Sequence, residues 1–400
     1  MATTTTMNQM RAWRGWPIFS FGFRPFFFFG ALDAALMIAL WVPWYLGIIA
    51  IPSMFAPVSW HVHELLFGYV PAIIAGFMLT AVPNWTGRLP VVGWPLAGLF
   101  SLWLLARLVI AFSAGVSPAL VYGVGLLFPL ALTALFAREV IAGRNWRNLK
   151  VIVVLSLFTA AQIFFYYENS RYGSSLYAER AGIALVIMLI QIIGGRVVPS
   201  FTGNWLRKRK SEALPLPFGR YDRLVMVLSA IALIIWIILP ALPMHTPAAG
   251  AVLILTGALN LIRQWRWRPL KTFGEPLVLI LHLSFLPVGL GFIFAGLVSA
   301  TGLSGAESAA IHCWTVGAIG GMTLAIMTRA SRGHTGRPLT APPATVFIYA
   351  MIMLALAARL AAAFQPAWTF TMIPVAGLGW TLAFAGFCLA YGPMLFSARR

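Results

Sequence analysis

The feature that most constrains this chain is a series of long apolar runs separated by short polar segments. Runs of about 20 residues, bounded by Pro, Gly or charged residues, give twelve candidate helices. They lie near 21–47, 59–82, 94–112, 116–137, 151–167, 180–201, 222–240, 247–263, 276–299, 306–328, 342–363 and 368–393. A helix of about 20 apolar residues crosses the hydrocarbon core of a bilayer. The sequence therefore predicts an all-α polytopic membrane protein, with residues 1–20 as a cytoplasmic N-terminal segment and 21–400 as a single transmembrane domain.

The composition agrees with a chain that lies in lipid. Of the 400 residues, 60% are hydrophobic and only 9% are charged, whereas soluble domains carry about 25% charged residues. A transmembrane β-barrel is excluded, because its strands would alternate in hydropathy over about ten residues. The two cysteines, Cys313 and Cys388, both fall in apolar runs and give neither a disulfide framework nor the spacing of a zinc site.

The distribution of positive charge indicates how the chain is oriented. The net charge of +19 does not indicate nucleic acid, because Lys and Arg gather in alternate connecting segments. These segments include both termini and the run from Arg207 to Lys210, whereas the other side holds only Arg171 and Arg180. Since cytoplasmic loops carry the excess of Lys and Arg, we expect both termini in the cytoplasm and the opposite face in the periplasm of a bacterial inner membrane.

Two parts of the sequence correspond to each other at matched spacings. His63 is followed 23 residues later by Thr86-Gly87-Arg88, and His312 is followed 23 residues later by Thr335-Gly336-Arg337. A fainter third copy ends at residues 199–204. These segments belong to the second, sixth and tenth helices, so we expect three repeats of four helices around a pseudo-threefold axis. Internal repeats in membrane proteins place the functional site at their interface.

The correspondence points to one pair of histidines and one pair of arginines. His63 and His312 lie at matched depth near the periplasmic ends of their helices, and two such imidazoles can ligate one haem iron from opposite faces. The alternative is that each histidine only forms a hydrogen bond with a neighbouring helix. Arg107 and Arg359 are related in the same way, in the next helices. They are natural partners for haem propionates, or else they extend to the membrane interface.

A second group of candidates surrounds the first histidine. Residues two apart on a helix point about 200° apart, so His61 and His63 are not expected to face one ligand. Glu64 follows His61 by three residues and would share its face. His61 and Glu64 are then a second metal site, a proton relay or a pair at the periplasmic rim. His282, early in the ninth helix, is a further candidate ligand.

Several long motifs resemble those of the NnrS family. They are Gly22–Phe27, Trp60–Gly68, Thr80–Arg88, Gly194–Pro199, Thr315–Thr323 and His334–Pro338. That family is described as haem- and copper-containing bacterial membrane proteins associated with denitrification and nitric oxide stress. The resemblance implies haem b, a copper site and a role in handling or resisting nitric oxide. If the chain is an enzyme, it implies an oxidoreductase that acts on nitric oxide or a related gas.

The predicted layout is also similar to the main subunit of haem–copper oxidases and nitric oxide reductases. There, histidines of helices 2 and 10 ligate a low-spin haem, and His63 and His312 match that placement. The resemblance thus implies a bis-histidine haem b between helices 2 and 10. Helices 6 and 7 lack the histidines of the usual copper and high-spin haem sites. Copper would therefore need His61, Glu64, His282 or a sulfur ligand.

Two functions of other classes fit twelve apolar helices. The first is a transporter, for example of haem, a metal or a nitrogen oxide. The second is an assembly or scaffold membrane protein without redox chemistry. A purified protein without a cofactor would favour the transporter, and co-purification with a reductase would favour the scaffold.

Overall fold

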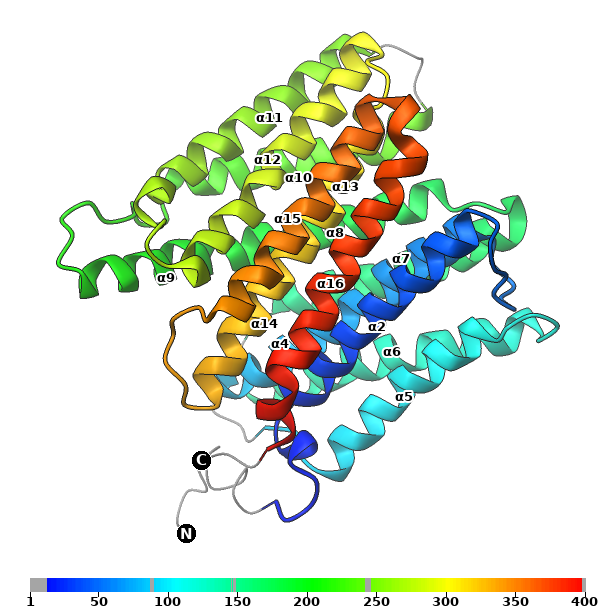
Figure 1. Cartoon of the computed structure of the whole chain (residues 1–400), viewed down its shortest axis with the longest axis horizontal. Helices are drawn as coiled ribbons and strands as arrows, with labels where there is room; N and C mark the ends of the chain where they lie inside the picture. Colours follow the sequence, from blue (N-terminus) through cyan, green and yellow to red (C-terminus); the bar gives the residue numbers. More distant parts are fainter. Residues whose placement is uncertain (1–12, 87–89, 145, 147–148, 242–245, 398–400) are drawn as a thin grey trace. The chain divides into compact units, whose positions relative to one another are not determined.

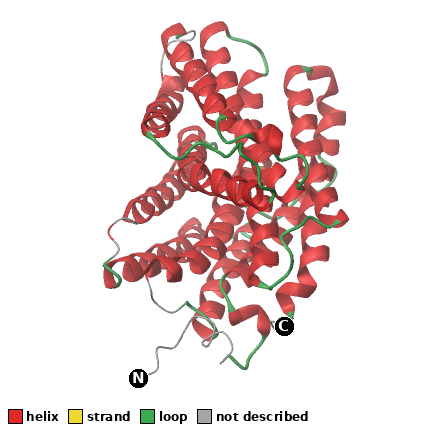
Figure 2. Ribbon diagram, turned by 90° about the vertical axis from the view of Figure 1, so that its left-hand side faces the viewer, coloured by secondary structure: helices red, strands yellow, loops and turns green. Residues whose placement is uncertain are grey.

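The computed structural model describes residues 13–86, 90–144, 146, 149–241 and 246–397, and it leaves undescribed the side chains of 82–86 and 150. Figure 2 shows helices joined by loops, and the residues that the structure describes contain no β-strand. The prediction of an all-α fold is confirmed.

Among the described residues, twelve helical spans are long and apolar enough to cross a membrane. They are Phe23–Tyr45, Pro57–Ala81, Trp94–Ala111, Pro118–Ala142, Val151–Tyr172, Leu176–Lys208, Arg220–Ala241, Pro247–Lys271, Pro276–Thr301, Ala306–His334, Pro343–Phe364 and Pro366–Phe396. Each span overlaps one of the twelve predicted runs, so the chain is a multi-pass membrane protein. The predicted arrangement of these helices as three repeats stays a prediction.

The chain divides into two compact units, which are described separately. Unit 1 comprises Met1–Gly182, His334–Gly336 and Phe387–Arg400. Unit 2 comprises Ile183–Gly333 and Arg337–Gly386. The prediction of one transmembrane domain over 21–400 stays a prediction.

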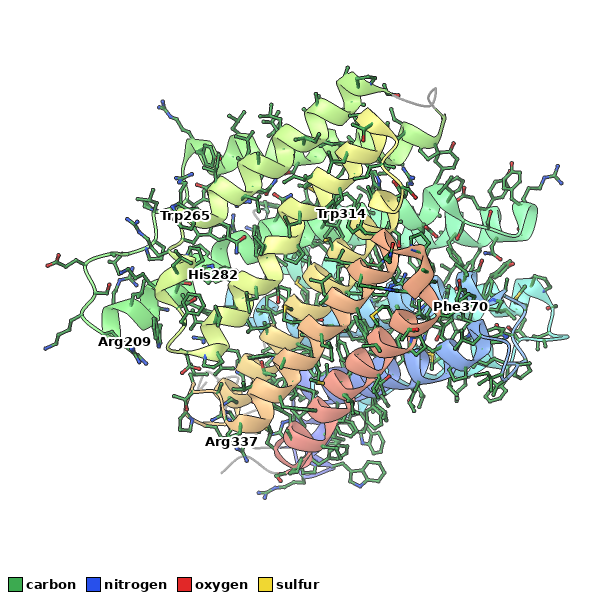
Figure 3. All side chains as sticks on the ribbon, turned by 45° about the horizontal axis from the view of Figure 1, so that its top comes forward. Arg209, Trp265, His282, Trp314, Arg337 and Phe370 are labelled. Carbon is green, nitrogen blue, oxygen red and sulfur yellow. The ribbon has the colours of Figure 1, made fainter. Side chains whose placement is uncertain are left out.

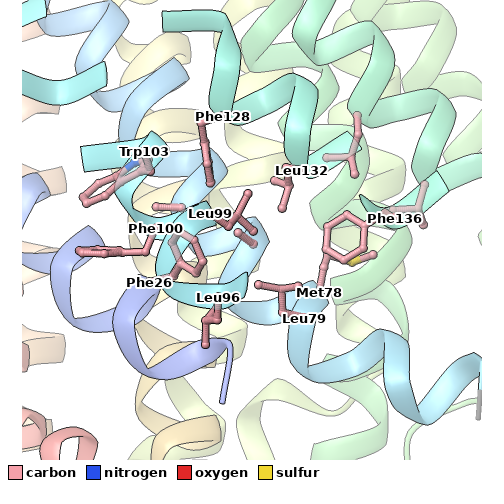
Figure 4. Close-up of a cluster of buried hydrophobic side chains, with 14 residues drawn as sticks. Phe26, Met78, Leu79, Leu96, Leu99, Phe100, Trp103, Phe128, Leu132 and Phe136 are labelled. Carbon is pink, nitrogen blue, oxygen red and sulfur yellow. The ribbon is translucent and has the colours of Figure 1, made fainter. Parts of the chain in front are cut away.

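Unit 1 holds the first five spans (Figure 1). Its elements are η1 Pro17–Ser20, α2 Phe23–Tyr45, α3 Pro57–Val62, η2 His63–Tyr69, α4 Val70–Thr86, α5 Trp94–Ala111, α6 Pro118–Ala142 and α7 Leu149–Tyr172, followed by the start of α8 Leu176–Leu189. Figure 4 shows apolar side chains of α2 and α4 to α7 packed together, among them Phe26, Met78, Leu99, Phe128 and Phe136. Because lipid is as apolar as these side chains, close packing rather than escape from water holds the helices together.

Unit 2 holds most of the remaining helices. They are the end of α8, η4 Ile190–Gly194, α9 Gly195–Lys208, α10 Arg220–Ile238, η5 Leu239–Ala241, α11 Pro247–Trp265, η6 Pro269–Lys271, α12 Pro276–Thr301, α13 Ala306–His312, η7 Cys313–Gly320, α14 Gly321–His334, α15 Pro343–Phe364, η8 Pro366–Trp368 and α16 Thr369–Phe396, whose last residues belong to unit 1.

Helices α11 and α12 lie side by side in unit 2 (Figure 1), and glycines allow their backbones to approach closely. A Cβ atom at Gly257 of α11 would lie 2.6 Å from the carbonyl oxygen of Gly289 on α12. Two turns away, a Cβ at Gly250 would lie 2.7 Å from the carbonyl oxygen of Gly296. Small residues at such positions are typical of helix pairs in membranes.

Three of the spans contain π-helical segments, which are η2, η4 and η7. In the first, the backbone N–H of Val70 donates to the carbonyl of Leu65, five residues earlier. In the third, the N–H of Gly321 reaches the carbonyl of Val316, again five residues earlier. π-Helical turns are rare and occur frequently at functional sites. The segments η2 and η7 begin at His63 and directly after His312.

Candidate functional site

His63 is the first residue of η2 and lies in a buried aromatic pocket of unit 1. Its exposed fraction is 0%. The Phe55 ring is nearly parallel to the imidazole, with the ring centres 5.5 Å apart. The ring centres of Phe165 and Tyr166, both on α7, each lie 5.4 Å from the centre of the imidazole. The helix distortion at η2 therefore presents this imidazole to α7 and not to lipid.

Both nitrogens of the His63 ring form hydrogen bonds. Nδ1 lies 2.9 Å from Oε1 of Glu64, and Nη1 of Arg107 lies 2.8 Å from the same oxygen. A carboxylate paired with an arginine can only accept, so Nδ1 carries the hydrogen and donates it. Nε2 then carries a lone pair. It lies 2.9 Å from the Tyr166 hydroxyl, which must donate to it.

Tyr166 is itself held in position by its neighbours. The side-chain amide of Gln162, one turn earlier on α7, donates to the tyrosine oxygen at 2.9 Å and to the backbone carbonyl of Gly125 at 3.2 Å. The Tyr122 ring stacks on Tyr166 with the centres 4.4 Å apart. A buried chain of hydrogen bonds thus runs from Arg107 through Glu64, His63 and Tyr166 to Gln162.

The guanidinium of Arg107 packs against a glycine. A Cβ atom at Gly68 would collide with Nη1 of Arg107, so the absence of a side chain there makes room for the guanidinium. The same backbone segment accepts a hydrogen bond from the Trp103 indole at the Gly68 carbonyl, at 3.0 Å. Arg107 is 6% exposed, so it does not extend to the membrane interface but pairs with Glu64.

Asp33 adds a second carboxyl group near this chain. It lies in the middle of α2, is 7% exposed, and interacts electrostatically with Glu64 and Arg107. Its Oδ2 atom has no hydrogen-bond partner among the described residues.

The structure separates His61 from His63, as predicted, but it corrects the predicted partner of Glu64. The His61 ring stacks on Trp41 of α2, with the centres 4.2 Å apart. Glu64 bonds to His63 and Arg107 and not to His61. The prediction assumed ideal helical angles, which fail where α3 changes to the π-helical η2. Charge also matters, because Arg107 draws the carboxylate to its own side.

His312 ends α13 in unit 2 and is half-buried. Its Nδ1 lies 2.7 Å from the backbone carbonyl oxygen of Ser308. A carbonyl only accepts, so this nitrogen carries the hydrogen and Nε2 carries the lone pair. Nη2 of Arg359, on α15, lies 2.7 Å from Nε2 and donates to it.

The hydrogen bonds of both histidines suit a metal at Nε2. A metal-binding imidazole almost always donates its other N–H to a carboxylate or a carbonyl, which fixes the tautomer. Glu64 plays this part for His63, and the Ser308 carbonyl plays it for His312. At His63 the Tyr166 hydroxyl stands at Nε2, and at His312 Nη2 of Arg359 stands there. A metal at either nitrogen therefore requires that donor to move.

The candidate copper ligands fall in the two different units of the chain. His61 and Glu64 belong to unit 1, whereas His282 lies on α12 of unit 2 (Figure 3). Nε2 of His282 lies 2.9 Å from the Thr202 hydroxyl. Over the described part of the chain, no three His, Cys, Asp or Glu side chains are close enough to hold a metal ion. Methionine sulfur lies outside this set of ligands, so copper stays a prediction.

A comparison with models of protein families shows which family the chain belongs to. A family model described as NnrS protein matches residues 17–399. The chain belongs to the NnrS family. This membership confirms the resemblance seen in the motifs, and together with the twelve spans it makes the chain a membrane protein of the NnrS family. A search of the curated proteins found no match.

Two residues of this site are absent from the sequence-based candidates. Gln162 and Tyr166 lie within an apolar run of the fifth span, where an aromatic residue is usually core. Their spacing of four residues puts both on one face of a helix. A polar pair on one face of a transmembrane helix is the signal that could have identified them.

Proposed function

We propose that this NnrS-family protein is a haem-binding protein of the bacterial inner membrane that acts in the response to nitric oxide. His63 and His312 are the proposed axial ligands of a haem b. The observation that supports this proposal is the shared hydrogen-bond pattern of the two imidazoles. In each, Nδ1 donates to an oxygen and Nε2 keeps its lone pair.

The neighbouring residues have distinct roles in this proposal. Glu64 holds the His63 tautomer, and Arg107 holds the Glu64 carboxylate in place. Tyr166 holds the ring until a ligand takes its place at Nε2. Arg107 and Arg359 are both proposed propionate contacts, and Arg107 already pairs with the carboxylate of Glu64. A haem held by both imidazoles would supply one-electron transfer, and nitric oxide would reach its iron only where one of the two imidazoles is displaced.

The bilayer and a small gas such as nitric oxide are the proposed partners. Family membership supports the nitric oxide role, and the apolar spans support the membrane. The proposal includes neither nucleic acid nor a specific electron donor.

The haem content of purified protein tests this proposal. We expect the pyridine haemochrome assay to find haem b in the wild type and to find little in His63→Ala or His312→Ala. His282→Ala and His61→Ala are the controls and should retain haem, because their imidazoles bond to Thr202 and stack on Trp41. Equal haem content in all four variants would remove the assignment.

A further inference from the structure

Unit 2 contains a second buried polar cluster, formed by Asp222 of α10, Gln191 of η4 and Arg263 of α11. Nε of Arg263 donates to Oδ1 of Asp222 at 3.1 Å, and Nη1 donates to Oε1 of Gln191 at 3.3 Å. The exposed fraction is 0% for both Arg263 and Gln191. None of these residues takes part in the proposed haem chemistry.

The cluster carries an excess of positive charge. The charged groups that act on Arg263 are Asp222 and Arg266, together with neutral Tyr221. Nη1 of Arg266 lies 3.5 Å from Oδ2 of Asp222, so two guanidinium groups share one carboxylate. Such a group has a net charge of +1, and its central guanidinium, that of Arg263, is fully buried, whereas the Arg266 side chain is 22% exposed. Buried charge is costly unless it is balanced.

Two hydrogen-bond donors in the cluster lack partners. Among the described residues, neither Nη2 of Arg263 nor Nε2 of Gln191 has an acceptor. Nη1 and Nη2 belong to one guanidinium, and Oε1 and Nε2 belong to one amide. The hydrogen bond between Nη1 and Oε1 joins the two side chains that carry the unused donors. Buried donors without acceptors are rare in folded proteins.

The backbone at this place is shaped to fit the Arg263 guanidinium. Gln191 lies in a π-helical segment, and Gly195 follows that segment directly. A Cβ atom at Gly195 would collide with Nη2 of Arg263, so the guanidinium packs against the glycine backbone and any other residue there would displace its unused donor. π-Helical segments often mark functional sites.

We propose that Arg263 and Gln191 bind a small monovalent inorganic anion. An anion accepts hydrogen bonds from both unused donors and neutralises the excess charge. Asp222 is near the start of α10, and Arg263 is in the last turn of α11. Both helix ends are predicted to face the cytoplasm, so the anion enters from that side. Chloride and nitrate share the chemistry that this site recognises.

The thermal stability of the purified full-length protein in detergent tests the proposal. The salt is sodium gluconate at fixed ionic strength, replaced stepwise by chloride in one series and by nitrate in another. Because a ligand that binds only the folded state raises the Tm, we expect a saturable rise in at least one series. The series with the lower midpoint identifies the preferred anion. A Tm that does not change in either series overturns the proposal and indicates that water alone fills the site.

Two variants and one control connect this response to the cluster. Gln191→Glu supplies a carboxylate from the protein itself and removes the amide donors, so the anion response should disappear. Gly195→Ala should weaken anion binding by about tenfold or more, as expected for losing a charge-assisted hydrogen bond. Gly203→Ala on the same helix is the control, because the atoms nearest its new methyl group belong to the flexible Arg207 side chain and lie 3.6 Å away or more. If Gly195→Ala fails to fold, Gln191→Glu decides alone. An unchanged response in Gln191→Glu overturns the assignment.

Discussion

The hydroxyl of Tyr166 lies 2.9 Å from Nε2 of His63 and donates its hydrogen to that atom. The two side chains come from helices about one hundred residues apart in the sequence, and both are buried. The contact fixes where the lone pair of His63 points. It also means that any ligand of His63 competes with one hydroxyl group.

Removing the Tyr166 hydroxyl should not reduce haem binding. Tyr166→Phe keeps the ring and its stacking on Tyr122 but removes the competing donor. We expect a haem-to-protein ratio equal to that of the wild type or higher. Tyr167→Phe is the matched control, since Tyr167 is 56% exposed. Loss of haem from Tyr166→Phe alone would mean that the phenol oxygen, and not His63, is needed to hold the iron.

Glu64→Gln should destabilise unit 1 strongly. The substitution leaves Arg107 buried without a carboxylate partner, and breaking a buried ion pair from one side costs about 3–5 kcal/mol. Unfolding in a series of SDS mole fractions measures this loss. Glu212→Gln changes an exposed glutamate in a loop and serves as the charge-matched control. Identical unfolding curves for the two variants would show that the pair contributes little.

Gly257→Ala should weaken the packing of α11 against α12. The added methyl group would lie 2.6 Å from a backbone carbonyl oxygen of the facing helix, which cannot rotate away as a side chain can. Overpacking of this kind costs about 1–3 kcal/mol of the free energy of unfolding. Gly123→Ala on α6 is the comparison, because a Cβ there meets nothing within 4 Å. A drop in Tm for Gly257→Ala only is the expected result.

Cysteine labelling tests the predicted orientation. Ser174 lies between the fifth and sixth spans, and Glu212 lies between the sixth and seventh. If the basic segments face the cytoplasm, a membrane-impermeant maleimide should label Ser174→Cys in cells whose outer membrane has been permeabilised and should not label Glu212→Cys. After the inner membrane is opened, both should react. The reverse pattern would invert the topology.

The positions of the spans could be predicted because a bilayer imposes a minimum apolar length. The ninth run was predicted at 276–299 and is found at Pro276–Thr301. The predicted ends of the spans were less accurate where charged residues continue a helix beyond its apolar part. The sixth run was predicted at 180–201, but the span covers Leu176–Lys208, because Arg207 and Lys208 prolong the helix beyond the apolar part. Hydropathy marks the part of a helix in lipid, not the whole helix.

The candidate site was predictable in part, for a different reason. Matched spacing singled out His63 and Arg107, and the structure joins them through Glu64. The contact with Tyr166 was not predictable, since it depends on how α7 packs against η2. The pairing of Asp222 with Arg263 was not predicted either, because it also depends on which helices pack against each other. Sequence spacing locates residues along one helix but not the helix that they face.

Electron paramagnetic resonance of the oxidised, purified protein tests the central claim most directly. With imidazole Nε2 atoms from His63 and His312 on both axial positions, the wild type should give a low-spin ferric haem signal. His63→Ala and His312→Ala should each lose that signal, whereas His61→Ala should keep it. A wild-type spectrum without low-spin haem, or a low-spin signal that persists in both His63→Ala and His312→Ala, would contradict the account.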